Sequence, residues 1–322
     1  MIGPEPGRYT CGMTKPFRFG VQAGGPADAV GWAELARKAE DFGVSVLTVA
    51  DHLDDQLAPI AALTAAACAT TTLRVGALVF CNDYRHPVVL AKEAATVDVL
   101  SGGRFELGLG AGWMTTDYEQ SGIPLDPPGD RIDRMEEALA VVKALFAEGP
   151  VNHEGTHYQV TALDGTPKPV QRPGPPLLIG GGGKRVLSIA AREADIVGVN
   201  VNLAGGVIDA SVGPNATVDA TDEKIAWIRE AAGDRFADLE LQIRVHLASI
   251  TADREGLAEV MGPALGLSPE AALASPHALA GTVDQVCDQL EERRERWGIS
   301  YIGLSATSLD EMAPVISRLT GT

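Results

Sequence analysis

The chain alternates short apolar runs with longer segments in which apolar residues recur every three or four positions. The short runs predict buried strands, and the longer segments predict helices with one apolar face. The predicted strands are 17–22, 44–51, 73–80, 104–112, 176–181, 195–200, 239–250 and 299–306. A helical segment follows each strand, as 184–193 follows the fifth.

Eight strand–helix units in a row predict an α/β protein built as a (β/α)8 TIM barrel. The predicted strands are almost continuously apolar, as expected for a parallel sheet that helices cover on both faces. An open, doubly wound sheet is the structural alternative, because it uses the same alternation of strands and helices.

Two insertions interrupt the regular pattern. Residues 151–175, after the fourth helix, alternate in polarity between turn signals and predict an excursion with a β-hairpin. Residues 201–219, after the sixth strand, are small, weakly charged and rich in glycine and asparagine, which favours a mobile loop over the barrel mouth. Neither is long enough for a second domain, so we expect a flexible N-terminal segment over 1–16 and one barrel domain over 17–322.

Composition narrows the possible partners and the compartment. The chain has 322 residues, 45% of them hydrophobic, and a net charge of −17 that nucleic-acid phosphates and anionic lipid would repel. No apolar run approaches the roughly 18 residues of a membrane span, and residues 1–16 have no apolar core of a secretion signal. Cys11, Cys68, Cys81 and Cys287 are scattered singly, which suits a reducing compartment. We expect a cytoplasmic protein that binds neither nucleic acid nor membrane.

Four consecutive glycines stand between the fifth predicted strand and its helix. A P-loop would need glycine at Leu178 and serine or threonine at Arg185, so the stretch is not one. A helix N-terminus carries free N–H donors and partial positive charge, and glycines let a phosphate approach the backbone. We interpret 180–183 (Gly180, Gly181, Gly182 and Gly183) with Lys184 as a phosphate site; a turn with helix-packing glycines is the alternative.

Two further stretches follow predicted strands and would face the barrel mouth. Asp51 and His52 end the second strand, where a histidine is useful as an acid–base group, although many such histidines are structural. The sequence GLGAGW, 108–113, departs from the dinucleotide fingerprint because Trp113 replaces its last glycine. It fits either a tight strand exit or a backbone that lies close to a flat ligand.

One apparent metal motif is set aside. HEGTH, 153–157, matches the zinc-protease pattern, which works only on a helix. Gly155 and the strand-like alternation that follows favour a hairpin here, so we expect no metal site.

Several of these segments together resemble the bacterial luciferase-like monooxygenase superfamily. The most informative are AEDFGVSVLTVADH, LRVGALVFCNDYRHPVVLAKEAATVDVLSGGRFELGLGAGW, EGTHYQV and LLIGGGG. The segment ALAGTVDQVCDQLEERRERWGISYIGL, 278–304, resembles actinobacterial F420-dependent oxidoreductases of that superfamily, whereas 201–277 diverges.

The resemblance implies a barrel that binds the deazaflavin coenzyme F420 or FMN at its mouth. His52 would lie near the reactive edge of the ring, and Leu78 and Val79 would form a bulge with a non-prolyl cis peptide. Asp51, Cys81 and Asn82 are further candidate cofactor contacts. Gly110, Ala111, Gly112 and Trp113 would approach the ring, and the glycine run would hold the phosphate. Trp113 stands where some deazaflavin dehydrogenases have a glutamate proton donor.

The favoured activity is F420-dependent hydride transfer to or from a small organic substrate, with His52 and Trp113 in the catalytic site. An FMN-dependent monooxygenase that uses O2 and a non-catalytic flavin-binding barrel are the alternatives. The alanine-rich helix 58–71 permits close approach of a neighbouring helix. Because family members often dimerise through this side of the barrel, the resemblance also implies a homodimer; burial of the helix within one subunit is the alternative.

Overall fold

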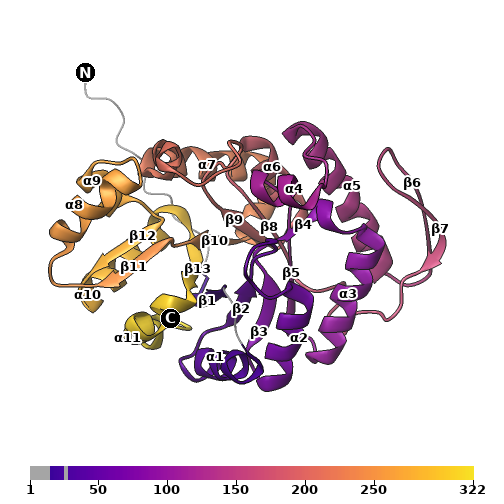
Figure 1. Cartoon of the computed structure of the whole chain (residues 1–322), viewed down its shortest axis with the longest axis horizontal. Coiled ribbons are helices and arrows are strands. Elements are labelled where there is room, and N and C mark those ends of the chain that lie inside the picture. Colours follow the sequence, from indigo (N-terminus) through magenta and orange to yellow (C-terminus); the bar gives the residue numbers. More distant parts are fainter. Residues whose placement is uncertain (1–14, 25–27) are drawn as a thin grey trace.

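The computed structural model describes residues 15–24 and 28–322, and its central feature is a closed barrel of parallel strands (Figure 1). The barrel strands are β1 (Arg18–Ala23), β2 (Val46–Val49), β3 (Arg74–Ala77) continued by β4 (Phe80–Cys81), β5 (Phe105–Gly110), β8 (Leu177–Gly181), β9 (Ile196–Val199), β10 (Glu240–Arg244) and β13 (Ile299–Ser305). Pairing of β3 with β5 and of β1 with β13 closes the ring. The predicted barrel is confirmed, and the open sheet is wrong.

Helices surround the barrel and follow its strands (Figure 1). They are α1 (Ala29–Asp41), α2 (Pro59–Ala69), α3 (Pro87–Leu100), α4 (Thr115–Ser121), α5 (Pro128–Phe146), α6 (Lys184–Glu193), α7 (Val218–Ala232), α8 (Arg254–Ala264), α9 (Pro269–Ala274), α10 (Val283–Trp297) and α11 (Leu309–Leu319). Short 3-10 turns are η1 (Asn82–Tyr84), η2 (Ala210–Ala216), η3 (Gly233–Ala237) and η4 (Ala306–Ser308). Local sequence sets several ends: Thr282 and Gln285 form a capping box on α10, which ends at Gly298 with φ 80°.

The predicted strand 239–250 is wrong as a single element. Only β10 belongs to the barrel; the chain then turns outward, and β11 (Leu247–Ile250) pairs in parallel with β12 (Ala278–Gly281) in a separate sheet. The N–H of His246 donates to the carbonyl oxygen of His277 at the start of that pairing. Since the apolar pattern continues through the turn, the sequence does not show where the strand leaves the barrel.

The predicted excursion contains the expected antiparallel hairpin, β6 (Pro150–Glu154) and β7 (Gln159–Asp164), which projects at one end of the molecule (Figure 1). The carboxylate of Glu137 on α5 fastens it: the N–H of His157 donates to Oε2 at 2.9 Å, and Nε2 of His153 lies 3.0 Å from Oε1. The two histidines of the apparent zinc motif therefore lie in a hairpin rather than on a helix.

The loop predicted over 201–219 is shorter in the structure. Residues 201–209 are irregular, but η2 and the start of α7 occupy the remainder. The loop's mobility stays a prediction. Of the predicted N-terminal segment 1–16, only Lys15 and Pro16 are among the described residues.

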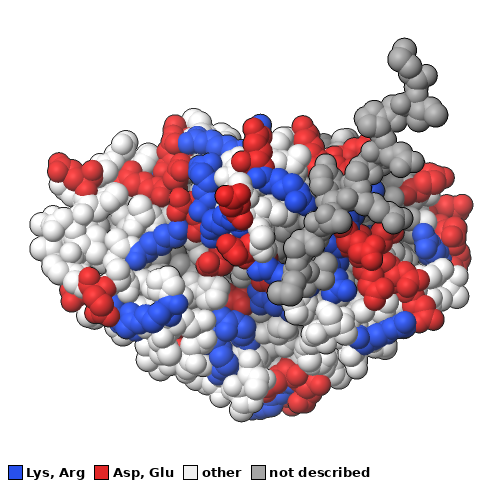
Figure 2. Space-filling model, turned by 180° about the vertical axis from the view of Figure 1, so that it is seen from behind, with Lys and Arg blue, Asp and Glu red and all other residues white. Residues whose placement is uncertain are grey.

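Charged groups of both signs are interleaved on the face of the molecule turned away from the view of Figure 1 (Figure 2). Ion pairs also join exposed residues of different elements, such as Arg296 with Asp222 at 2.6 Å and Lys143 with Glu193 at 2.7 Å. Within the described ranges, no helix combines the length and apolar character needed to cross a membrane.

A charged network fills the amino-terminal end of the barrel. Glu106 is buried there and contacts Arg18 at 2.7 Å and Arg74 at 2.6 Å. Arg18 also pairs with Glu240 at 2.6 Å and lies 4.0 Å above the ring centre of Tyr301. Burial alone would raise the pKa of the Glu106 carboxyl, but the two guanidiniums hold that pKa below its ordinary value.

This network predicts a large stability loss for Glu106→Gln. The amide removes the charge that both arginines face, so the free energy of unfolding should fall by roughly 3–5 kcal/mol in urea denaturation at pH 7. A carboxylate with a lowered native pKa stabilises the fold above its unfolded pKa, and this contribution disappears as pH falls through the native pKa. The difference between the two proteins should therefore shrink below about pH 4.

Glu148→Gln is the matched control, because Glu148 forms an exposed ion pair with Arg172 at 3.2 Å. Its effect should stay below about 1 kcal/mol. Equal effects of the two substitutions would contradict a structural role for the buried network.

Candidate functional site

A cavity of about 480 Å³ lies at the carboxyl ends of the barrel strands. This is where enzymes with this fold place their active sites, and the volume is within the usual range for small-molecule sites. The sequence-predicted residues that line it are Asp51, His52, Leu78, Val79, Cys81, Gly110, Ala111, Gly112, Trp113, Gly180, Gly181, Gly182 and Gly183. Residues far apart in the sequence are thus brought together as predicted.

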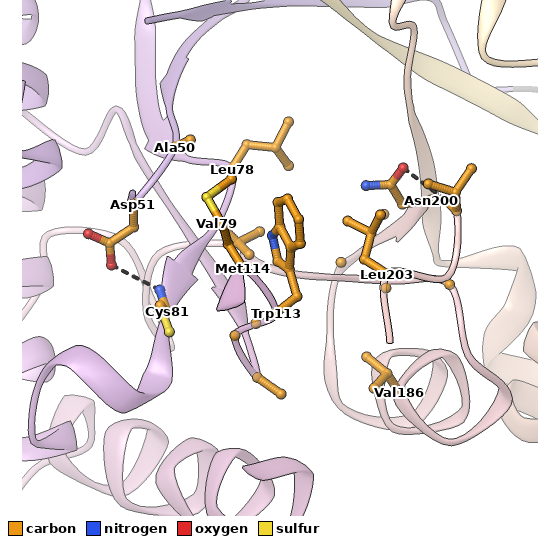
Figure 3. Close-up of a pocket in the computed structure, with 18 of the residues that line it drawn as sticks. Ala50, Asp51, Leu78, Val79, Cys81, Trp113, Met114, Val186, Asn200 and Leu203 are labelled. Atoms are coloured by element: carbon orange, nitrogen blue, oxygen red, sulfur yellow. Dashed lines mark hydrogen bonds between the residues drawn. The ribbon is translucent and has the colours of Figure 1, made fainter. Parts of the chain in front are cut away.

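Val79 and Trp113 form a largely apolar part of this cavity. Trp113 projects between the Leu78–Val79 segment and Leu203 (Figure 3). The Leu78–Val79 peptide is cis, as the resemblance implied. A Cβ on Gly110 would lie 2.6 Å from Cγ2 of Val79, so the bare backbone at the end of β5 allows this close packing. The result is a surface against which a flat ring could lie.

His52 is held by a carboxylate that sequence reasoning missed. Nδ1 of His52 lies 2.7 Å from Oδ2 of Asp117, a buried residue of α4. Asp117 also accepts the N–H of Leu53 at 3.1 Å and the hydroxyl of Tyr84 at 3.0 Å. An ionised carboxylate only accepts hydrogen bonds, so Nδ1 carries the proton and Nε2 remains to exchange one.

The hydroxyl of Tyr84 is a firm donor in this arrangement. Burial, together with the neighbouring thiol of Cys81 and the carboxylate of Asp117, raises the pKa of Tyr84 far above its ordinary value. Asp117 is 65 residues from His52 in sequence and lies on a short helix, so no local sequence pattern predicts that the two side chains pair.

Asp51, the residue before His52, does not orient the imidazole. Two guanidinium nitrogens of Arg85 donate to the Asp51 carboxylate, at 2.5 and 3.1 Å. The carboxylate also accepts the N–H of Cys81 at 2.9 Å (Figure 3). Asp51 therefore holds β4 and the turn that follows it, and its oxygens are engaged by the protein itself.

Cys81 lies on the cavity as an un-ionised thiol. Its Sγ is 3.5 Å from the hydroxyl of Tyr118, which in turn donates to Asp83 at 2.9 Å. Burial raises the pKa of the Cys81 thiol to about 11, so it is protonated at neutral pH. This makes Cys81 a packing and contact residue rather than a nucleophile.

Asn82 and Lys184 are the two predicted site residues that do not line the cavity. The side chain of Asn82 is buried and donates to the hydroxyl of Tyr158 at 3.1 Å. Lys184 is exposed and faces Glu230 at 3.5 Å. Their predicted cofactor contacts find no support in these positions.

The glycines of the run differ in whether packing requires them. A Cβ on Gly181 would lie 2.6 Å from Val186, and one on Gly182 would lie 2.3 Å from the carbonyl of Val201, so packing requires both. Gly183, by contrast, begins α6 with φ −99°, and its Cβ would meet only Asn202, at 3.9 Å. Packing does not require glycine there, and the absent side chain leaves the N-terminus of α6 open toward the cavity.

Other cavity residues were not found from the sequence. They include Gln22, Tyr84, Met114, Asp117, Arg131, Asn200, Leu203, Gln242, Arg244 and His246. Arg131 is buried and donates to the carbonyl oxygens of Ala111 and Gly112, so it supports the loop that carries Trp113. Gln22 ends the predicted strand 17–22, which was an available signal, whereas Arg244 lies in the middle of the predicted strand 239–250 and gave none.

No group of histidine, cysteine, aspartate or glutamate side chains in 15–24 and 28–322 is arranged to hold a metal ion. The donors on the cavity instead suit an organic ligand: an acid–base histidine, an apolar wall and an open helix N-terminus.

Comparison with solved structures supports the fold. The F420-dependent tetrahydromethanopterin reductase of Methanopyrus kandleri superposes with a TM-score of 0.74 at 21% identity, over 95% of this chain and 98% of that one.

Sequence relatives include enzymes named for both cofactors. An F420-dependent glucose-6-phosphate dehydrogenase of Microbacterium testaceum is 31% identical over 57% of this chain and 56% of its own length. An FMNH2-dependent dimethylsulfone monooxygenase of Pseudomonas putida is 29% identical over 43% of this chain and 38% of its own length. The chain thus matches only about half the length of these relatives, or less.

The luciferase-like monooxygenase family model matches residues 10–261, which is more than half of the chain. Together with the barrel and its mouth cavity, this match shows that the chain belongs to the luciferase-like monooxygenase family.

Proposed function

We propose that this protein binds coenzyme F420 in the barrel mouth and catalyses hydride transfer to or from a small organic substrate. The observation that carries the proposal is the pairing of His52 with Asp117 beside Trp113, whose ring centre lies 5.4 Å from that of His52. Such a pair supplies the proton transfer that must accompany hydride transfer at an alcohol or carbonyl carbon. The relative from Microbacterium testaceum, named as F420-dependent, adds support for this cofactor.

The residues present fit such a cofactor. The deazaflavin ring, when bound, accepts or gives up a hydride. Val79 and Trp113 offer apolar contact to a flat ring, and Gly183 leaves the first N–H groups of α6 open to a phosphate. Leu203, from the loop after β9, also lines the cavity and adds apolar surface to it.

His52 would act as the acid–base group that accepts and returns the proton. In alcohol oxidation, the substrate carbon loses a hydride while its hydroxyl loses a proton to Nε2 of His52. Asp117 keeps Nδ1 protonated and stabilises the resulting imidazolium. In the reverse direction, the imidazolium returns the proton to the carbonyl oxygen as the hydride arrives.

An FMN-dependent monooxygenase is the second candidate. The relative from Pseudomonas putida is named as an FMNH2-dependent monooxygenase, and the apolar wall at Val79 would suit either ring system. A non-catalytic flavin-binding barrel is less well supported, because the His52–Asp117 pair has no evident packing purpose.

Cofactor choice is tested by titrating the purified protein separately with F420 and FMN and following absorbance and fluorescence. We expect saturable binding of F420. Gly183→Asp should weaken that binding roughly tenfold to a hundredfold, because its carboxylate would face the phosphate at the start of α6.

Gly183→Asn is the matched control, since asparagine has the same shape and caps a helix equally well but carries no charge. Equal affinities of the Asp and Asn variants would place the phosphate elsewhere. Binding of FMN alone would favour the monooxygenase.

The acid–base role of His52 is tested with His52→Ala. Turnover with F420 should fall roughly 10²–10⁴-fold, while the cofactor dissociation constant changes by less than about tenfold. Nitrogen NMR should show the wild-type His52 protonated at Nδ1, and Asp117→Asn should disturb that tautomer.

His86→Ala serves as the control, because His86 caps α3 and is exposed. It should retain turnover. If His52→Ala loses affinity and turnover together, His52 is a binding residue; if neither changes, the proton has another source.

We also propose a homodimer formed through α2. Its inner face packs on the barrel, whereas Ala61, Ala65 and Cys68 are exposed on its outer face. Ala65→Arg should convert a dimer to a monomer in light scattering at micromolar concentration. Ala140→Arg, at an exposed alanine of α5, should not. A monomeric wild type would contradict the proposal.

A further inference from the structure

The end of β10 presents hydrogen-bond donors to the cavity that the reaction proposed above does not use. Gln242 and Arg244 both line the cavity, two positions apart on this strand. Residues two apart on a strand point to the same side. The end of β10 is therefore one continuous polar wall of the cavity.

Gln242 is 2% exposed, and its Nε2 has no hydrogen-bond partner among the described residues. A buried amide donor without an acceptor is costly, so native proteins rarely keep one without a reason. Because this side chain lines the cavity, a ligand that carries an acceptor oxygen would supply the missing partner.

Arg244 is a partly buried cation whose hydrogen bonds go only to neutral acceptors. Its Nε donates to Oε1 of Gln22 at 2.7 Å, and Nη1 donates to the carbonyl oxygens of Val245 and Gly303. Across the described part of the chain, it has no carboxylate within ion-pair distance, and its Nη2 makes no hydrogen bond. Burial lowers the pKa of Arg244 to about 10, so it is still charged at neutral pH.

Gln22 fixes the direction of the guanidinium. Besides accepting from Arg244, Gln22 donates through its Nε2 to the carbonyl oxygen of Leu78 at 3.4 Å. The guanidinium is thus held in place before any ligand arrives, which reduces the entropy cost of binding.

We propose that Arg244 and Gln242 form a subsite for the carboxylate or sulfonate group of an anionic organic substrate. The proposal deepens the proposed function and rests on it. The free Nη2 of Arg244 offers a charged N–H donor to such a group, and the free amide of Gln242 offers a second donor. Met114, Leu203 and Ile208 line the same cavity and would contact an apolar remainder of the molecule.

This subsite is separate from the proposed phosphate site. The glycine run ends β8, and β9 lies between β8 and β10 in the barrel. His52 follows β2, on the other side of β1 and β13 from β10. A substrate anchored on Arg244 would therefore extend across the mouth toward His52.

The test uses protein saturated with the cofactor that the titrations identify, so that the phosphate site is already filled. Hexanoate and hexanesulfonate are the probes, and hexanamide is the neutral control of matched shape. Binding is followed by the shift in Tm and by the change in cofactor fluorescence. We expect saturable binding of at least one anion and none of the amide at the same concentration.

Two substitutions at Gln242 separate charge from packing. Gln242→Met keeps the length but removes the donor, and it should fold because the lost donor had no partner; we expect anion binding to weaken several-fold. Gln242→Glu places a carboxylate beside Arg244 and should weaken binding roughly tenfold to a hundredfold. Arg244→Lys, whose single ammonium cannot keep the bonds to Gln22 and Gly303 and also supply the free Nη2 donor, should weaken anion binding at least tenfold.

Anion binding that is the same in wild type, Gln242→Glu and Arg244→Lys would overturn the subsite. Equal binding of hexanamide and the anions would overturn it as well. If neither cofactor binds, the proposed function fails, and the probes are then titrated into Gly183→Asp apoprotein, in which the α6 site is blocked. Loss of binding on adding Gln242→Glu to that protein would still support the subsite.

Discussion

Closure of the barrel is the constraint on which the rest of this structure depends. Because all eight strands are parallel, closing the ring places every carboxyl end at one mouth and every amino end at the other. Glu106 fills the amino end with Arg18 and Arg74 around it, so that end is a satisfied, closed layer. The mouth keeps an open cavity, and the residues just after each strand become neighbours there.

Sequence periodicity was sufficient for the barrel and most of its helices. The bounds predicted for α6 match the structure, since the glycine run and Glu193 delimit a strongly amphipathic segment. The same reasoning failed at 239–250, where β10 and β11 share one apolar run although they belong to different sheets. Apolar character reports burial, and both strands are at least partly buried; it cannot report which sheet a strand joins.

The sequence located cavity-lining residues where they follow a barrel strand directly, and it missed those whose position depends on a tertiary partner. His52, Val79 and Trp113 line the cavity as expected. Asp117 was missed because it lies on the short helix α4, and only the folded chain brings it to His52. The family resemblance made Asn82 a candidate cofactor contact; in the structure Asn82 begins η1, and its amide donates to the hydroxyl of Tyr158.

The acidic residues at the mouth are already hydrogen-bonded to other side chains of the protein, and this affects which ligands the cavity can bind. Asp51 pairs with Arg85, and Asp117 accepts hydrogen bonds from His52 and Tyr84. These partners reduce the repulsion that either carboxylate would exert on an anionic ligand. In a chain of net charge −17, the long-range field still opposes the approach of anions. Recognition must therefore come from short-range donors that are already desolvated and oriented, which are worth most inside a cavity and are little affected by salt. The open N-terminus of α6 and the wall formed by Gln242 and Arg244 are donors of this kind, at two separate places in one cavity.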